Sequence, residues 1–170
     1  MFKRLFGFKN RKALVVVDPQ AGVVTEETLG VARSIASLID KGEYKVSAAT
    51  QFINVPGSLT YKLGIRGMQD GDSIKILGMI EDRIDLSVTK EGRFAPDRDL
   101  SDALNALNVK CVDVVGFNTQ AVILSTASKL KMSGFDVKVL TQYCGFALGM
   151  HPQDDDMKEM KMVLGDENVK

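Results

Sequence analysis

The sequence predicts a three-layer, doubly wound α/β protein, with a mostly parallel sheet of five to six strands and helices on both faces. Two observations carry this prediction. Short continuous apolar runs, such as Ala13 to Val17, are typical of strands that are buried on both faces. They alternate with segments whose apolar residues recur at helical spacing, as in Asp97 to Leu107. This alternation favours a parallel sheet with helical crossovers.

The first half of the chain is predicted to hold two strands joined by a helix, followed by a long loop. Thr25 can cap a helix whose apolar face runs to Ile39. The second strand is expected at Lys45 to Thr50. Residues Asn54 to Gly71 are rich in glycine and contain a proline, which is typical of an irregular loop. Loops of this length in compact domains are usually functional or mobile.

The second half of the chain continues the alternation of strands and helices. Strands are expected at Ser73 to Leu77, Ile84 to Val88, Cys111 to Val115 and Val137 to Thr141. Helices are expected over Asp97 to Leu107, Gln120 to Met132 and residues 152 to 163. Residues 165–170 are polar and are expected to form a frayed tail.

Composition narrows the classes of function. The chain has 170 residues, 45% of them hydrophobic and 26% charged, with zero net charge, which is typical of a globular protein. A nucleic-acid partner would require a basic surface, and no apolar run reaches the roughly 18 residues of a membrane span. Cys111 and Cys144 are too few for a disulfide framework. We expect one cytoplasmic domain over residues 1–170, with a basic, Phe-containing lead-in at residues 1–12 and neither nucleic-acid nor membrane partners.

Residues that could carry chemistry are predicted to meet at one edge of the sheet. Ligands bind α/β sheets beyond the carboxyl ends of the strands, near a switch point. Asp18 and Lys90 each follow a predicted strand, and a turn that begins at Gly116 follows another. Such a strand-turn-helix elbow presents the first helical side chains to a pocket, at the positive end of the helix dipole. Val122 occupies this position, and its side chain can only pack.

Each candidate also has a structural interpretation. Asp18 can form a turn or cap a helix, and Lys90 can be a solvated loop residue. Asn118 and Thr119 can cap the following helix. The only histidine, His151, has no cluster of His, Asp or Cys beside it, so no metal site is expected. The sequence lacks a phosphate-loop or dinucleotide motif, and we expect no cofactor.

Taken together, these segments resemble the isochorismatase-like cysteine hydrolase superfamily, which includes nicotinamidases and isochorismatases. The resemblance covers about Ala13 to His151. The run ALVVVDPQ is similar to the family's strand that ends in Asp-x-Gln, which implies that Asp18 is a general acid or base. The run SVTKEGRFAPDRDL is similar to the segment with the catalytic Lys, which implies that role for Lys90. The block VVGFNTQAVILSTASKLKMSGFDVKVL is similar to Gly-x-x-Thr-Asp-x-Cys-Val-x-x-Thr-Ala and places Val122 in the Cys column.

Three departures from the family pattern concern its chemistry. Val122 stands in place of the nucleophile, and Gln120 in place of the Asp of the Thr-Asp pair. The Asp/His metal cluster of nicotinamidases is missing after the second strand, where Gln51 to Asn54 stand. Amide hydrolysis through a thioester-like intermediate needs a thiolate. We therefore expect that the chain lacks nicotinamidase activity.

The sequence favours a pocket that binds a small planar or nucleotide-like molecule, in order to sense, carry or sequester it. Phe52 or Phe94 would stack on this ligand. Besides Asp18 and Lys90, the residues expected to contact it are Gln20, Gln51, Phe52, Phe94, Asn118, Thr119, Gln120, Ala121 and Val122.

Two other functions stay open at this point. One is a hydrolase that uses Asp18 alone to protonate a vinyl ether, as the resemblance to isochorismatases implies. The other is an oligomeric structural or regulatory module. The family resemblance also implies a homo-oligomer, either a dimer or a tetramer.

Overall fold

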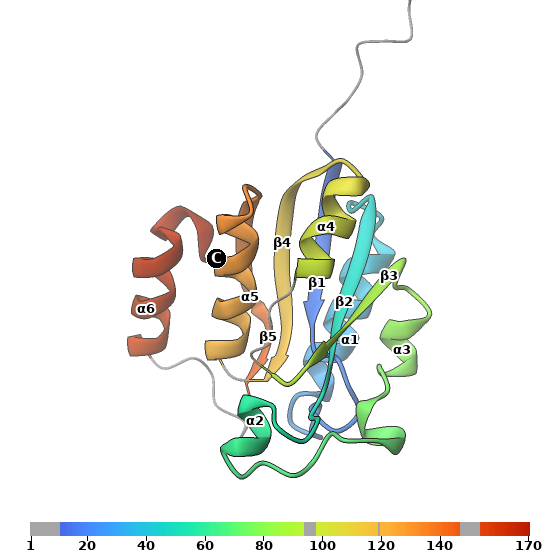
Figure 1. The fold of residues 1–170 in the computed structure, drawn as a ribbon. Helices are drawn as coiled ribbons and strands as arrows, with labels where there is room; N and C mark the ends of the chain where they lie inside the picture. The colour runs from blue at the N-terminus through green and yellow to red at the C-terminus, as the bar shows by residue number, and fades with distance from the viewer. Residues whose placement is uncertain (1–10, 94–97, 119, 147–153) are drawn as a thin grey trace, which may run out of the picture.

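The protein is built on a five-stranded parallel sheet (Figure 1). The computed structural model describes residues 11–93, 98–118, 120–146 and 154–170. The strands run in the order β3-β2-β1-β4-β5, with these bounds: β1 Arg11–Val17, β2 Val46–Ile53, β3 Leu86–Glu91, β4 Val109–Asn118 and β5 Asp136–Phe146. All four pairings are parallel. The chain winds from β1 to β3 on one side and then returns to β4, so the switch point lies between β1 and β4.

Helices cover both faces of the sheet, and the predicted three-layer class is confirmed. One face carries α1 (Leu29–Asp40) and α3 (Gly78–Glu81). The other carries α4 (Arg98–Ala106), α5 (Gln120–Met132) and α6 (Asp154–Leu164). The short helix α2 (Leu59–Lys62) lies beyond the carboxyl ends of the strands (Figure 1). Among the described residues, no helix is long and apolar enough to cross a membrane.

The central strand β1 shows why its sequence is continuously apolar. Its residues Ala13 to Val17 are all fully buried. Because side chains alternate across a strand, Ala13, Val15 and Val17 join the core beneath α5, while Leu14 and Val16 join the core beneath α1.

Several predicted boundaries in the first half of the chain are wrong. The first helix begins at Leu29, because Thr25 and Thr28 hydrogen-bond to each other in a preceding turn. The segment Ser73 to Leu77 is not a strand. It contains part of the 3₁₀ helix η1 (Gly71–Ile74), and its single bridge joins Ile76 to Gln20.

The strands that frame the site also differ from their predicted ranges. β3 is displaced from Ile84–Val88 to Leu86–Glu91, so Lys90 lies inside this strand rather than after it. β5 extends to Phe146 and therefore includes Cys144. Both shifts lengthen the row of strand residues at the carboxyl edge of the sheet.

The polar tail is docked, and the prediction of fraying is wrong. Residues Asp166–Asn168 form the 3₁₀ helix η2, and Val169 is buried beside Val139. The backbone N–H of Lys170 donates to the carbonyl of Val139 at 3.0 Å. One buried valine in a polar segment, together with this added strand-like pairing, holds the segment against β5.

Candidate functional site

Asp18 lies directly after the central strand and is fully buried. Its backbone φ is +48°, in the left-handed region that non-glycine residues seldom adopt but Asp tolerates better than most. The Thr50 hydroxyl accepts from the Asp18 N–H at 3.1 Å and donates to Asp18 Oδ1 at 2.6 Å. Thr50 therefore fixes both the backbone and the carboxylate of Asp18.

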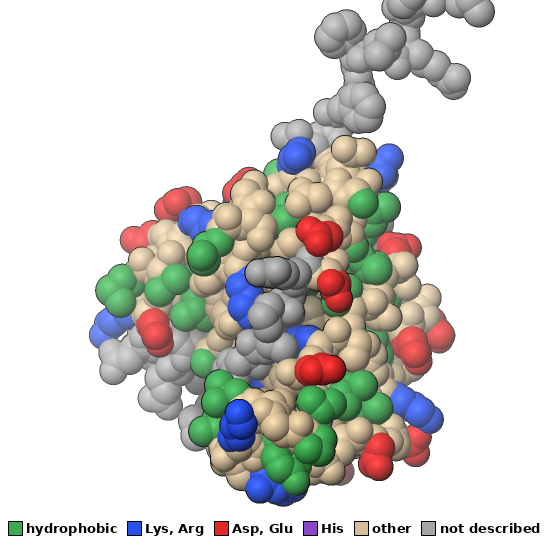
Figure 2. All heavy atoms as spheres, viewed as in Figure 1, with side chains coloured by type: hydrophobic (Ala, Val, Ile, Leu, Met, Phe, Trp, Pro, Cys, Tyr) green, Lys and Arg blue, Asp and Glu red, His purple; other side chains and the backbone are tan. Residues whose placement is uncertain are grey.

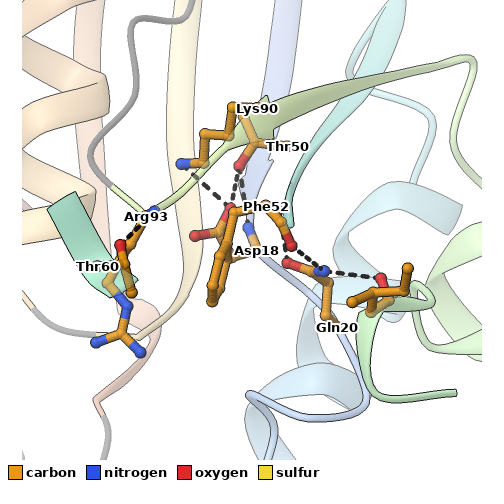
Figure 3. Close-up of polar contacts among 8 residues, drawn as sticks. Asp18, Gln20, Thr50, Phe52, Thr60, Lys90 and Arg93 are labelled. Carbon is orange, nitrogen blue, oxygen red and sulfur yellow. Dashed lines mark hydrogen bonds and ion pairs between the residues drawn. The ribbon is translucent and has the colours of Figure 1, made fainter. Parts of the chain in front are cut away.

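Lys90 reaches Asp18 from two strands away. Its Nζ lies 3.3 Å from Asp18 Oδ1, and the Lys90 side chain is 2% exposed. In the parallel register Val88 pairs with Thr50, and Lys90 pairs with Phe52. Since Val88 belongs to the core beneath α5, strand alternation places Thr50, Phe52 and Lys90 on the face that α5 covers. Figure 3 shows both contacts converging on one oxygen of Asp18.

The buried ion pair is held by its surroundings rather than by water. Removing two charges from water costs several kcal/mol per ion, so such a pair persists only with good geometry and added hydrogen bonds. Thr50 supplies two of these bonds to Asp18. The structure thus brings Asp18 and Lys90 together as predicted and adds Thr50, which sequence reasoning had treated only as the end of a strand.

Val122 lies in the first turn of α5 and is fully buried. It belongs to the same core cluster as Val17 and Val88, on the α5 side of the sheet. An isopropyl group has neither a proton to give nor a lone pair to attack with. The first turn of this helix therefore contributes an apolar wall and no nucleophile.

Cys144 does not replace the missing thiol. It is buried in β5, opposite Gly116 of β4, and its Sγ contacts the carbonyl oxygen of Leu140 at 3.4 Å. Burial raises the pKa of the Cys144 thiol to about 12. Because the thiolate is the reactive form, this residue is structural, as its sequence setting suggests.

Gln20 and Gln51 are engaged in the scaffold, and their predicted ligand contacts are corrected accordingly. Gln20 is fully buried: its Nε2 donates to the carbonyls of Phe52 and Ile74, and its Oε1 accepts from the Phe52 N–H. Gln51 donates to the same Ile74 carbonyl at 2.6 Å. Strand alternation directs Gln51 to the face opposite Thr50 and Phe52.

Phe52 is fully buried, and sequence reasoning missed its neighbour Arg93. The Arg93 guanidinium carbon lies 5.5 Å from the centroid of the Phe52 ring, within the range of a cation–π contact. Because no surface of Phe52 remains exposed, its ring holds Arg93 in place rather than stacking on a ligand. An arginine in a loop after a strand belongs to no motif, and only the fold shows that it reaches the site.

The remaining predicted contacts have mixed outcomes. Ala121 is exposed in the first turn of α5. Asn118 ends β4 and Gln120 begins α5, so both lie at the predicted elbow. Phe94, Thr119 and His151 lie outside the described residues.

The side chains after β2 do not suit a metal ion. Asn54 is buried, and its amide donates to the carbonyls of Ile65 and Gly67 while its oxygen accepts from Ser58. Over the ranges that the structure describes, no group of three His, Cys, Asp or Glu residues is placed to hold a metal ion. Asn54 instead closes the loop onto β2, an arrangement that the sequence did not reveal.

Solved structures of hydrolases share this architecture. The pyrazinamidase of Pyrococcus horikoshii, determined in complex with zinc, matches with a TM-score of 0.69 and 18% identity over 94% of this chain and 97% of that chain. The N-carbamoylsarcosine amidase of Thermoplasma acidophilum matches with a TM-score of 0.74 and 17% identity over 94% and 95% of the two chains. An isochorismatase-like hydrolase of Alkaliphilus metalliredigens matches with a TM-score of 0.73 and 13% identity over 94% and 93%.

No protein-family model and no curated protein matches the sequence. The similarity therefore lies in the fold, and Asp18, at the end of the first strand, is part of a site built on that fold. This chain has the α/β fold of the isochorismatase-like hydrolases.

Proposed function

We propose that the protein binds a small planar or nucleotide-like molecule beside the Asp18–Lys90 pair and does not hydrolyse it through a thiol. The observation that carries this proposal is the pairing of an intact buried Asp18–Lys90 contact with an inert side chain, Val122, in the first turn of α5. Several neighbours by fold are named as amidases. Loss of a nucleophile removes covalent catalysis and leaves the polar groups available for recognition.

Binding would serve to sense, carry or sequester the molecule. The Asp18–Lys90 pair supplies polar groups in a site of low dielectric, where hydrogen bonds to a ligand are strong. Val122 supplies an apolar surface on the α5 side. Few polar groups on an apolar wall are characteristic of small-molecule sites.

Native mass spectrometry of the purified full chain tests this proposal, together with thermal-shift measurements against planar metabolites and nucleotides. We expect a retained small molecule, or a rise in melting temperature that is lost in Asp18→Asn. The same spectrum gives the number of subunits, which tests the expected homo-oligomer. Absence of any retained or stabilising ligand, with an oligomer unaffected by Asp18→Asn, would favour a purely structural module.

The Val122→Cys variant asks whether only the nucleophile is missing. Cys is smaller than Val and apolar enough for the buried position, so the variant should fold. If the rest of the site still suits amide hydrolysis, this variant gains amidase activity that the parent lacks. If the site has been reshaped for another ligand, the variant stays inactive and keeps the ligand preference of the parent.

A second candidate function is hydrolysis that depends on Asp18 without a thiol. It is favoured by the carboxylate geometry: Lys90 and Thr50 both contact Oδ1, and the other oxygen points away from Lys90 (Figure 3). A protonated Asp18 could donate to the vinyl carbon of an enol ether, after which water adds to the resulting oxocarbenium carbon and the alcohol leaves. Such general acid catalysis contributes about a hundred-fold to ten-thousand-fold. Turnover of isochorismate that survives Asp18→Asn would exclude this mechanism.

A further inference from the structure

Arg93 is a second cation beside Asp18. It lies three residues after Lys90, just beyond β3, and its backbone N–H donates to Thr60 Oγ1 at 2.9 Å. Figure 3 shows its side chain extending past Thr60, on the same side of Asp18 as the Phe52 ring. The backbone bond to Thr60 and the ring of Phe52 fix the guanidinium from two sides.

The guanidinium of Arg93 is partly withdrawn from water without gaining a hydrogen-bond partner. Its Nε is buried and unbonded, and among the described residues no carboxylate lies within ion-pair distance of Arg93. Burial lowers the pKa of Arg93, and the nearby Asp18 charge partly offsets this effect. A guanidinium has five N–H donors, and leaving a buried charged donor unsatisfied costs stability. The site therefore favours an additional acceptor.

The charges of the described side chains indicate what that acceptor is. Asp18 supplies one negative charge, while Lys90 and Arg93 supply two positive charges. The adjacent carboxylate of Glu91 is exposed and, by strand alternation, leaves the opposite face from Lys90. One positive charge thus remains unbalanced. A ligand with a single negative charge would neutralise it.

We propose that Arg93 binds the carboxylate of the ligand, so that the ligand class is a small planar ring carrying one carboxylate. This inference rests on the proposed binding function and specifies its ligand. The planar fork of a guanidinium matches the two oxygens of a carboxylate. A phosphate monoester carries about −1.5 to −2 charges at neutral pH, more than Arg93 alone balances. Phe52 acts on the arginine and not on the ligand, because it holds the guanidinium in the orientation that receives the anion.

Benzoate and benzamide form a matched pair of probes, because they share ring and shape and differ in charge. Titrations of the full chain by calorimetry or NMR should give a benzoate affinity at least about tenfold above that for benzamide, as expected for a hydrogen bond to a charged group. In Arg93→Gln the benzoate affinity should fall at least about tenfold, and the preference over benzamide should vanish. Arg93→Lys keeps the charge without the fork and should give an intermediate affinity.

Arg66→Gln is the matched control. Arg66 also lies over an aromatic ring, with its guanidinium carbon 4.1 Å from the Tyr61 centroid, but it is exposed and donates to the backbone carbonyl of Tyr61. Its substitution should leave benzoate binding unchanged. The contacts described for Arg93 include no hydrogen bond from its side chain, so Arg93→Gln should fold. If it does not, Arg93→Lys and the benzoate–benzamide preference of the parent still decide the question.

The outcomes separate this inference from the function on which it rests. If the parent binds benzamide as tightly as benzoate, or if Arg93→Gln binds benzoate like the parent, the role of Arg93 is overturned while ligand binding stands. A tenfold preference for phenyl phosphate over benzoate overturns the carboxylate assignment. If neither ring probe nor any molecule of the wider screen binds, the proposed function itself fails and the inference fails with it.

Discussion

Two buried aspartates, Asp18 and Asp113, are each paired with a lysine and a hydroxyl, yet they lie in different settings. At the carboxyl edge, on the α5 face, Asp18 contacts Lys90 and Thr50. In β4, on the α1 face, Asp113 contacts Lys12 Nζ at 2.7 Å and the Tyr44 hydroxyl at 2.7 Å. The Lys90 side chain is 2% exposed, whereas that of Lys12 is 42% exposed.

The comparison shows that solvent access, rather than residue type, separates a site from a fastening. Lys12 can exchange its carboxylate for water at small cost, and it also lies 5.2 Å from the centroid of the Tyr44 ring. Lys90 has no such exchange, because its ammonium group is enclosed with Asp18. The Asp113 cluster therefore ties Tyr44 to the sheet, while the Asp18 cluster concentrates charge where a ligand could use it.

Lys90→Met should show the largest loss of stability. It leaves the Asp18 charge in a buried position without its lysine, and breaking a buried pair costs about 3 kcal/mol or more. Urea unfolding of the variant measures this as a lower free energy of unfolding. The double variant Asp18→Asn with Lys90→Met is the control and should recover part of the loss. A Lys90→Met protein as stable as the parent would contradict the enclosed ion pair.

Tyr44→Phe should cost less and should leave the site intact. It removes the hydroxyl that donates to Asp113, and a hydrogen bond to a charged group contributes about 1.5 kcal/mol. Urea unfolding checks the loss, and the benzoate titration checks the site. Altered benzoate affinity would mean that the two aspartate clusters are coupled through the sheet.

The stability of the parent should fall more steeply with pH than that of Tyr44→Phe in alkaline solution. Burial and the hydrogen bond to Asp113 raise the pKa of Tyr44 well above its ordinary value. Above pH of about 10, the unfolded phenol loses its proton while the folded one keeps it, so ionisation favours the unfolded chain. Because Tyr44 is only partly buried, we expect a difference of about 1 kcal/mol between pH 9 and pH 11. Parallel curves in urea unfolding at these pH values would rule out the raised pKa.

Lys12→Met should have the smallest effect. Its ammonium group is partly solvated, and exposed ion pairs contribute about 0.5 kcal/mol. Raising the ionic strength should weaken the parent pair slightly and leave the variant unchanged. A loss as large as that of Lys90→Met would show that exposure does not distinguish the two clusters.

The fold class and the Asp18–Lys90 contact could be predicted from sequence because both follow from the order of strands. Parallel strands bring their carboxyl ends to one edge, so a polar residue near such an end is already a candidate. What the sequence could not supply was the face. Gln20 and Gln51 lie near the same edge as Asp18, but their amides bond to the backbone of Phe52 and Ile74. Only the register of β2 and β3 shows which neighbours of Lys90 share its face.

Other features depended on contacts between segments distant in sequence. Arg93 reaches Phe52 across 41 positions of the numbering, counted as 93 minus 52, so no local pattern could join them. Asn54 organises the loop that ends near Met68 by bonding to Ile65 and Gly67, although its composition suggested only irregularity. Val169 is buried in a tail whose polar sequence gave no reason to expect docking.

The close contact between β1 and β4 limits how this protein could be redesigned. Gly116 has φ of +133°, and a Cβ placed there would lie 2.4 Å from backbone atoms of Val17, the residue before Asp18. A mutant library aimed at new ligands must therefore keep glycine at this position. Diversity is better placed at Arg93, whose side chain holds no described hydrogen bond and leaves room for exchange. The junction of β1 and β4 thus acts as the fixed frame of an adaptable receptor.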